Sequence, residues 1–163
     1  MYPTDLTVAA IVRRDNAYLM VEERANGRLV FTQPGGHIEA SESPEQAVVR
    51  EVLEETGCTV NCGELVGVYL WIHPQTRQQF LRLVFEAHFE SSDSNATLDD
   101  GILRALWLGR EDIESRRDRL RTPVVLRCLQ DYEQGKRQAD SLFTGMLPLQ
   151  HNVDAVLAKA DLV

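Results

Sequence analysis

The sequence has no long apolar segment, few cysteines and no excess of basic residues, and each shortage excludes a class of protein. No run approaches the roughly 20 apolar residues of a membrane-spanning helix, and the first residues, MYPTDLTVAAIVRRDN, lack the apolar stretch of a signal peptide. The 17 lysines and arginines are outnumbered by 25 aspartates and glutamates, so the net charge is −8. A chain this acidic is not expected to bind a nucleic-acid polymer or an anionic membrane through its overall charge. We expect a cytoplasmic, soluble protein that needs cations to handle phosphates.

The cysteines are poorly spaced for metal binding. Cys58, Cys62 and Cys128 fit no zinc framework, because two further ligands are missing near the first two. We expect reduced, partly buried thiols with a structural role. The four histidines are scattered along the chain and predict no metal cluster either.

A chain of 163 residues that is 44% apolar has the size and composition of one globular domain. It has no internal repeat, no low-complexity tract and no linker rich in proline, glycine and serine. We expect a single domain over residues 1–163, with its core at about 5–137. Residues 138–163 are a C-terminal extension, in which only the segment after Asn152 has the apolar spacing of a helix.

Apolar and β-branched segments predict six strands. Asp15-Asn16 and Asn26-Gly27 have turn chemistry, and the third strand stops at a proline and two glycines. We expect a hairpin loop at 73–78 and a polar loop at 91–101. The predicted strands are 6–14, 17–24, a short strand from 28, 65–72, 81–89 and 102–108.

Three helices are predicted before the C-terminal extension. Ser43 begins a capping box, with proline at the first helical position and Gly57 at the end, so the helix spans about 44 to 56. Residues 110–120 are a short polar candidate. Thr122 is expected to cap a third helix that starts at Pro123 and ends before Gly135. Its apolar stripe is interpreted as core packing and consists of Val125, Cys128, Leu129 and Tyr132.

Residues 35–57, GGHIEASESPEQAVVREVLEETG, carry six glutamates and one arginine. On a helical wheel with about 100° per residue, Glu51, Glu54 and Glu55 share one side, around the small Ala47. Carboxylates three and four residues apart repel one another, so another group is expected to offset the repulsion. An adjacent apolar arc is expected to face the core, and it consists of Val48, Val49, Val52 and Leu53.

The residues alone leave two explanations open. The acidic side is either a solvated surface with Arg50 as its counter-ion or a cation site. The cation site is favoured because the acidic arc adjoins the apolar arc and because the preceding Pro-Gly-Gly turn lets backbone groups approach a ligand closely. Carboxylate and carbonyl oxygens are the ligands that Mg²⁺ or Mn²⁺ prefers. Such a site would recruit a polyphosphate to an acidic protein.

The same segment resembles the signature of the Nudix hydrolase family. The fixed positions are matched at the required spacing by Gly36, Glu42, Arg50, Glu51, Val52, Glu54, Glu55 and Gly57. Only the final aliphatic position departs, because it holds Cys58. The resemblance covers about residues 5–135. It implies an α/β (α+β) fold, an α/β/α sandwich with a mixed β-sheet, in which this Nudix box supplies the catalytic loop and helix.

The resemblance implies a metal-dependent hydrolase with Mg²⁺ as cofactor, or Mn²⁺ as the alternative. Its catalytic residues would be Arg50 and the three carboxylates of Glu51, Glu54 and Glu55, which would bind the metal together with the Gly36 carbonyl.

Further roles follow from the same resemblance. Glu42 would pair with Arg50 to hold the loop against the helix, and Gly36 and Gly57 would be structural. Glu51 would orient or deprotonate the attacking water. Some family members take this base from a later loop, where Asp99 and Asp100 are the alternatives here.

Within the family, the segments FLRLVFEAHF and RTPVVLRCLQDYEQGKR resemble the bacterial NudJ phosphatase branch. This implies release of phosphate from nucleoside tri- and diphosphates and from thiamine-precursor pyrophosphates, namely hydroxymethylpyrimidine pyrophosphate and thiamine pyrophosphate. Pyrophosphohydrolysis of ADP-ribose, dinucleoside polyphosphates or oxidised nucleotides is the alternative, and a non-catalytic nucleotide-sensing domain is an alternative of another class. The expected partner is a small nucleotide or pyrophosphate substrate, and the protein would be a monomer or homodimer.

Substrate choice would depend on side chains outside the Nudix box. Tyr69 and Trp71 alternate onto one strand face, where they would stack on a ring or simply cover the sheet. Arg77 and Arg82 would contact phosphate or be solvated.

Overall fold

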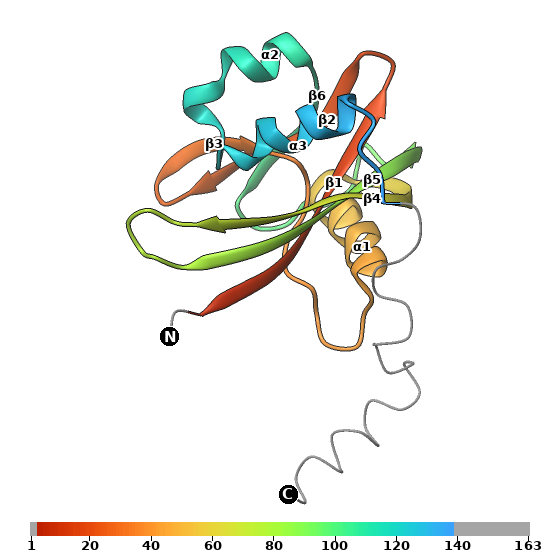
Figure 1. Ribbon diagram of the computed structural model, residues 1–163. Coiled ribbons are helices and arrows are strands. Elements are labelled where there is room, and N and C mark those ends of the chain that lie inside the picture. The colour runs from red at the N-terminus through yellow and green to blue at the C-terminus, as the bar shows by residue number, and fades with distance from the viewer. Residues whose placement is uncertain (1–2, 139–163) are drawn as a thin grey trace, which may run out of the picture.

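The computed structural model describes residues 3–138 (Figure 1). The helix expected after Asn152 lies outside the described residues. The strands are β1 (Thr4–Arg14), β2 (Ala17–Ala25), β3 (Arg28–Thr32), β4 (Cys58–Ile72), β5 (Gln79–Ser92) and β6 (Ile102–Gly109). The helices are α1 (Pro44–Thr56), α2 (Arg110–Ser115) and α3 (Val124–Glu133), with a 3-10 turn, η1, at Arg117–Arg119.

The six strands form one mixed sheet. Its order is β3-β2-β1-β5-β4, and β6 pairs with β2. β1 and β5 are parallel, and the other pairings are antiparallel. β1 and β2 pair next to the Asp15-Asn16 turn, through Arg13 with Tyr18 and Arg14 with Ala17. Most of β1 instead pairs with β5, so β1 joins the two halves of the sheet.

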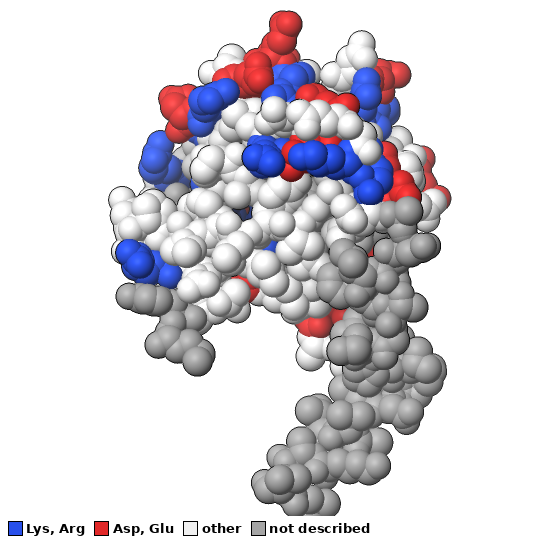
Figure 2. Space-filling view, viewed as in Figure 1, with Lys and Arg blue, Asp and Glu red and all other residues white. Residues whose placement is uncertain are grey.

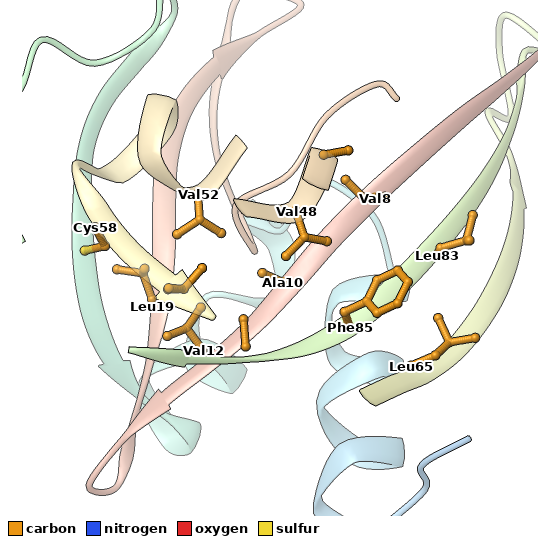
Figure 3. Close-up of a cluster of buried hydrophobic side chains, with 13 residues drawn as sticks. Val8, Ala10, Val12, Leu19, Val48, Val52, Cys58, Leu65, Leu83 and Phe85 are labelled. Carbon is orange, nitrogen blue, oxygen red and sulfur yellow. The ribbon is translucent and has the colours of Figure 1, made fainter. Parts of the chain in front are cut away.

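Helices cover both faces of the sheet. Alternate residues of β1 point to opposite faces, so Val8, Ala10 and Val12 pack beneath α1, as Figure 3 shows, whereas Ala9 and Ile11 pack beneath α3. Figure 1 shows the same arrangement, with α1 and α3 on opposite sides of the strands. The predicted α/β/α sandwich with a mixed sheet is therefore confirmed.

The ends of α1 agree with the sequence prediction, but its orientation does not. The hydroxyl of Ser43 accepts a hydrogen bond from the Gln46 N–H, the Gln46 side chain completes the capping box, and Gly57 ends the helix in the left-handed conformation with φ of 68°. Leu53 was expected to face the core, but it is 48% exposed. Glu51 and Glu55 are buried instead, at 8% and 9% exposure. The helix is rotated so that part of its acidic side faces the interior.

The remaining elements differ from prediction mainly at their ends. β4 begins at Cys58, several residues before the alternating pattern, and the polar helix expected at 110–120 is divided into α2 and η1. α3 begins at Val124, and no side chain caps it, so the predicted cap at Thr122 is wrong. Cys58, Cys62 and Cys128 are free thiols, as expected. No helix within residues 3–138 is long and apolar enough to cross a membrane.

Candidate active site

The loop before α1 is fixed against β1 by backbone hydrogen bonds. The N–H of Val8 donates to the Gly36 carbonyl at 2.8 Å, and the N–H of Ala10 donates to the Pro34 carbonyl at 2.9 Å. A Cβ at position 35 would lie 2.2 Å from the Val8 carbonyl oxygen, so only glycine allows this approach. At Gly36, a Cβ would lie 2.6 Å from both carboxylate oxygens of Glu51. The two glycines therefore bring the loop backbone directly onto a carboxylate of α1.

Arg50 connects this loop to the acidic side of α1. Its Nε and Nη2 donate to the two carboxylate oxygens of Glu42 at 3.0 and 2.6 Å, and Nη2 also donates to the His37 carbonyl at 2.9 Å. Its Nη1 donates to one oxygen each of Glu51 and Glu54, at 2.8 and 3.0 Å. The bonds to Glu42 raise the pKa of Arg50 and lower the pKa of Glu42. The expected pair of Arg50 and Glu42 is present, and it closes the loop over the helix.

Two of the three candidate metal ligands, Glu51 and Glu55, have carboxylates that are largely shielded from water. Burial raises the pKa of Glu51, and the Arg50 guanidinium opposes that effect. Burial raises the pKa of Glu55 to about 8, although the Gly35 N–H donates to its Oε2 at 2.8 Å. The Glu51 charge raises the pKa of Glu55 further. The charged forms of both residues therefore require a compensating positive charge.

The free oxygens of these carboxylates are suited to a hard cation. One oxygen of each accepts no hydrogen bond from residues 3–138, namely Oε2 of Glu51, Oε1 of Glu54 and Oε1 of Glu55. The Gly36 carbonyl already accepts the Val8 N–H and keeps one lone pair. In the described part of the chain, no three His, Cys, Asp or Glu side chains converge on one point. The donor chemistry thus fits Mg²⁺ or Mn²⁺, and a bound ion would have to draw the carboxylates together.

The loop at 91–101 brings one of the two candidate bases, Asp99, towards this site. The Asp99 N–H donates to the Glu54 carbonyl at 3.1 Å, and the Asp99 carboxylate contributes to the raised pKa of Glu51. Asp100 is exposed, and its side chain has no hydrogen bond or ion pair within residues 3–138. Asp99 is therefore the better placed of the two alternative bases.

A pocket of about 190 Å³ opens beside the loop of the two glycines. It reaches Gly36 and Glu55 at one side and Trp71 at another, and Arg82 also contributes to it. A larger depression of about 550 Å³ lies between α2, η1 and α3, but no residue of the 35–57 segment lines it. The smaller pocket is therefore the one that can hold a molecule bound to the acidic side of α1. Its lining residues are Thr7, Gly35, Gly36, His37, Glu55, Trp71, Phe80, Arg82, Arg121, Thr122 and Val124.

The four residues considered for substrate binding lie in different places. Trp71 and Arg82 line the pocket, and Trp71 packs on Phe80 with ring centroids 5.6 Å apart. Tyr69 does not line it, and its hydroxyl donates to Asp131 at 2.9 Å and so ties β4 to α3. Arg77 is exposed in the hairpin turn. The structure thus brings two of the four to the same pocket.

Several pocket residues carried no functional prediction from the sequence. Thr7 is a polar residue within an apolar strand, which is a signal that could have been used. Thr122 was assigned to a helix cap, whereas its hydroxyl has no hydrogen-bond partner in the described region. Arg121 pairs with Glu23, and Phe80 lies just before the predicted strand. These side chains come from separate segments, so no local motif joins them.

Comparison with known proteins agrees with this geometry. Residues 3–127 match the NUDIX domain. The chain is 33% identical over 137 residues to the protein named Phosphatase NudJ of Escherichia coli K12, covering 84% of this chain and 88% of the relative. It is 39% identical to a NUDIX hydrolase of Nitrosomonas europaea, with a TM-score of 0.82 and coverage of 90% and 96%.

A more distant structure shares the fold. It is the bifunctional NMN adenylyltransferase/ADP ribose pyrophosphatase of Francisella tularensis, solved with AMP and a Mn ion. Its TM-score is 0.61 at 22% identity, with 83% of this chain and 42% of that chain covered.

Proposed function

The chain belongs to the Nudix hydrolase family, whose enzymes act on phosphorus-containing anhydrides, and we propose that it is a metal-dependent phosphatase of small nucleotides. Its substrates would be nucleoside tri- and diphosphates, with hydroxymethylpyrimidine pyrophosphate and thiamine pyrophosphate as further candidates, and it would release orthophosphate. The observation that carries this proposal is the set of three carboxylates on α1, each with a free oxygen, beside a glycine backbone and a small pocket. The NudJ relatives, which are named phosphatases, support the choice of product.

Nudix hydrolases are generally dependent on a divalent metal, and Mg²⁺, or alternatively Mn²⁺, would be held here by Glu51, Glu54 and Glu55. The Gly36 carbonyl would be a further ligand. When bound, the cation neutralises phosphate charge and activates water. The chain would then need no nucleophilic serine or cysteine.

The residues around this site would divide the remaining tasks. Arg50 would hold Glu51 and Glu54 in place through Nη1, while its other nitrogens fix the loop through Glu42. Glu51 would orient or deprotonate the attacking water, with Asp99 as the alternative base. Water would attack the terminal phosphorus, the bridging P–O bond would break, and the shortened nucleotide would leave with the bridging oxygen.

Glu54→Gln tests the metal role. With Mg²⁺ and ADP supplied, we expect kcat to fall by about 100-fold or more, because a neutral amide is a much weaker ligand for a hard cation. Glu45→Gln, which removes a carboxylate from the first turn of the same helix, is the matched control. Unchanged turnover in a folded Glu54→Gln protein would exclude this residue as a ligand.

A substrate panel with Mg²⁺ tests the reaction class. Orthophosphate release from ADP and ATP would support a phosphatase. Pyrophosphate release, or activity confined to ADP-ribose, a dinucleoside polyphosphate or an oxidised nucleotide, would replace it with a pyrophosphohydrolase. Tight nucleotide binding without turnover, across a series of metals, would indicate a sensing domain.

A further inference from the structure

We propose that Arg82 anchors the phosphate that stays with the organic part of the substrate, so that the pocket selects a single ring carrying that phosphate. This inference rests on the proposed phosphatase function and identifies which end of the substrate the pocket holds. Arg82 lines the pocket with two threonine hydroxyl groups, and it lies between the Nudix box and an aromatic wall formed by Trp71 and Phe80.

The guanidinium of Arg82 contacts no counter-ion in the described part of the chain. It lines the pocket, yet within residues 3–138 it makes no hydrogen bond and no ion pair. Burial lowers the pKa of Arg82, and the neighbouring Arg121 guanidinium lowers it further. Arginine nevertheless keeps its proton, and a partly buried guanidinium with no contacting carboxylate can bind an anion. Its fork of donors matches the oxygens of a phosphate.

Two hydroxyl groups beside Arg82 are also without partners. Thr7 is 3% exposed and Thr122 is partly buried, and the Oγ1 of each has no hydrogen-bond partner in the region that the structure describes. Both residues line the same pocket. Thr7 is directly opposite Arg82 in the parallel pairing of β1 with β5, so their side chains share one face of the sheet. Three donor groups therefore line one pocket, where a phosphate could satisfy them.

The sheet register places Arg82 between the Nudix box and the aromatic wall. On one side, Thr7 pairs with His37, next to Gly36. On the other side, Phe80 lies two residues before Arg82 on β5, about 7 Å away, and pairs with Trp71. A phosphate at Arg82 would thus have the metal-binding carboxylates on one side and a ring on the other.

The size and surroundings of the pocket limit its ligand. A volume of about 190 Å³ is below the roughly 300 Å³ at which pockets for drug-sized ligands begin. This space suits one ring and one phosphate, not two nucleosides. Figure 2 shows one face of the molecule, whose middle is mainly uncharged with small areas of basic side chain between uncharged ones. The charged side chains that line the pocket are one carboxylate, Glu55, and two arginines, Arg82 and Arg121.

Binding of the product AMP tests the inference without requiring turnover. The chain has two tryptophans, so a Trp107→Phe background leaves Trp71 as the only one, and its fluorescence can report binding of AMP and of adenosine with Mg²⁺ present. We expect AMP to bind at least about 10-fold more tightly than adenosine, because a hydrogen-bonded ion pair adds to the ring contact. Arg82→Met should remove that difference and leave adenosine binding unchanged.

Further variants separate a phosphate contact from a structural effect. Arg82→Lys should restore part of the AMP preference, and Thr7→Val should weaken AMP binding several-fold. Arg24→Met, at an exposed arginine of β2, should change nothing. If Arg82→Met does not fold, as judged by circular dichroism, Arg82→Lys and Thr7→Val carry the test.

Two results would overturn the inference. One is an undiminished AMP preference in the folded Arg82 variants, and the other is an equal loss of AMP and adenosine binding. The proposed function fails separately, if ADP and ATP release no orthophosphate while AMP binding still depends on Arg82.

Discussion

Replacing Glu55 with glutamine should stabilise the metal-free protein, and the gain should grow with pH. Glu55 is a carboxyl group whose ordinary pKa of 4.5 is raised to about 8, chiefly by burial and then by the nearby Glu51 charge. In the unfolded chain it loses its proton near pH 4.5. Between these two values the folded protein binds more protons than the unfolded protein, so the free energy of unfolding falls as pH rises. Above pH 8 this loss is complete.

The size of the effect follows from the two pKa values. Their difference of about 3.5 pH units corresponds to about 5 kcal/mol, as an upper limit, because water entering the site would screen the charge. At pH 5 the wild-type protein should have lost less than about 1 kcal/mol of this contribution. The glutamine side chain oxygen can still accept the Gly35 N–H. The substitution therefore removes mainly the buried charge.

Urea unfolding in EDTA at pH 5 and pH 9 measures this difference. We expect the free energy of unfolding of Glu55→Gln to exceed that of the wild type by several kcal/mol at pH 9 and by little at pH 5. The matched control is Glu39→Gln, at an exposed glutamate in the same loop and helix segment, which should show no such pH dependence. Equal stability differences at both pH values would refute the reasoning.

A divalent cation should reverse the order at high pH. In the proposed metal site Mg²⁺ would bind the charged carboxylates of the folded state, so it should stabilise the wild type and have much less effect on Glu55→Gln. Equal stabilisation of both proteins by Mg²⁺ would place the ion away from Glu55.

Three further predictions concern the surroundings of the acidic helix. Gly36→Ala places a methyl group 2.6 Å from the Glu51 carboxylate oxygens. The kcat with ADP and Mg²⁺ should therefore fall by at least about 10-fold, while circular dichroism shows a retained fold. Turnover at the wild-type rate would mean that the Glu51 carboxylate can move without loss of activity. Tyr69→Phe removes the hydrogen bond to Asp131 and should lower the free energy of unfolding by about 1 kcal/mol, with little change in kcat/KM; a large loss of kcat/KM would mean that Tyr69 contacts substrate. Asp99→Asn should reduce kcat by about 100-fold or more if this aspartate is the base, and near-normal turnover with an unchanged pH profile would leave Glu51 in that role.

The ends of α1 were predicted correctly because helix capping depends on residues that are close in the sequence. The capping box at Ser43 and the left-handed Gly57 depend only on nearby backbone, and both are present as expected. The side of α1 that faces the core was predicted less well, because the helical-wheel projection assigned apolar residues to the core and charged residues to solvent. Leu53 is exposed and Glu55 is buried, and the Gly35 N–H donates a hydrogen bond to the Glu55 carboxylate.

The pocket could not be predicted because it depends on distant parts of the chain. Thr7 and Arg82 become neighbours only through the parallel pairing of β1 with β5, and no local pattern specifies that partner. The role given to Thr122 was wrong for a related reason. A threonine before proline usually caps a helix, but here its hydroxyl lies among pocket residues instead.

The contacts of Arg50 have a consequence for how this enzyme can change. One guanidinium closes the loop through Glu42 and also fixes the carboxylates of Glu51 and Glu54. Lysine would keep the positive charge but lose the branched donor geometry. A mutation of Arg50 that changes the position of the Glu51 and Glu54 carboxylates must therefore also change the conformation of the loop before α1. New specificities are more accessible through the pocket walls, where side chains can vary without disturbing this shared support.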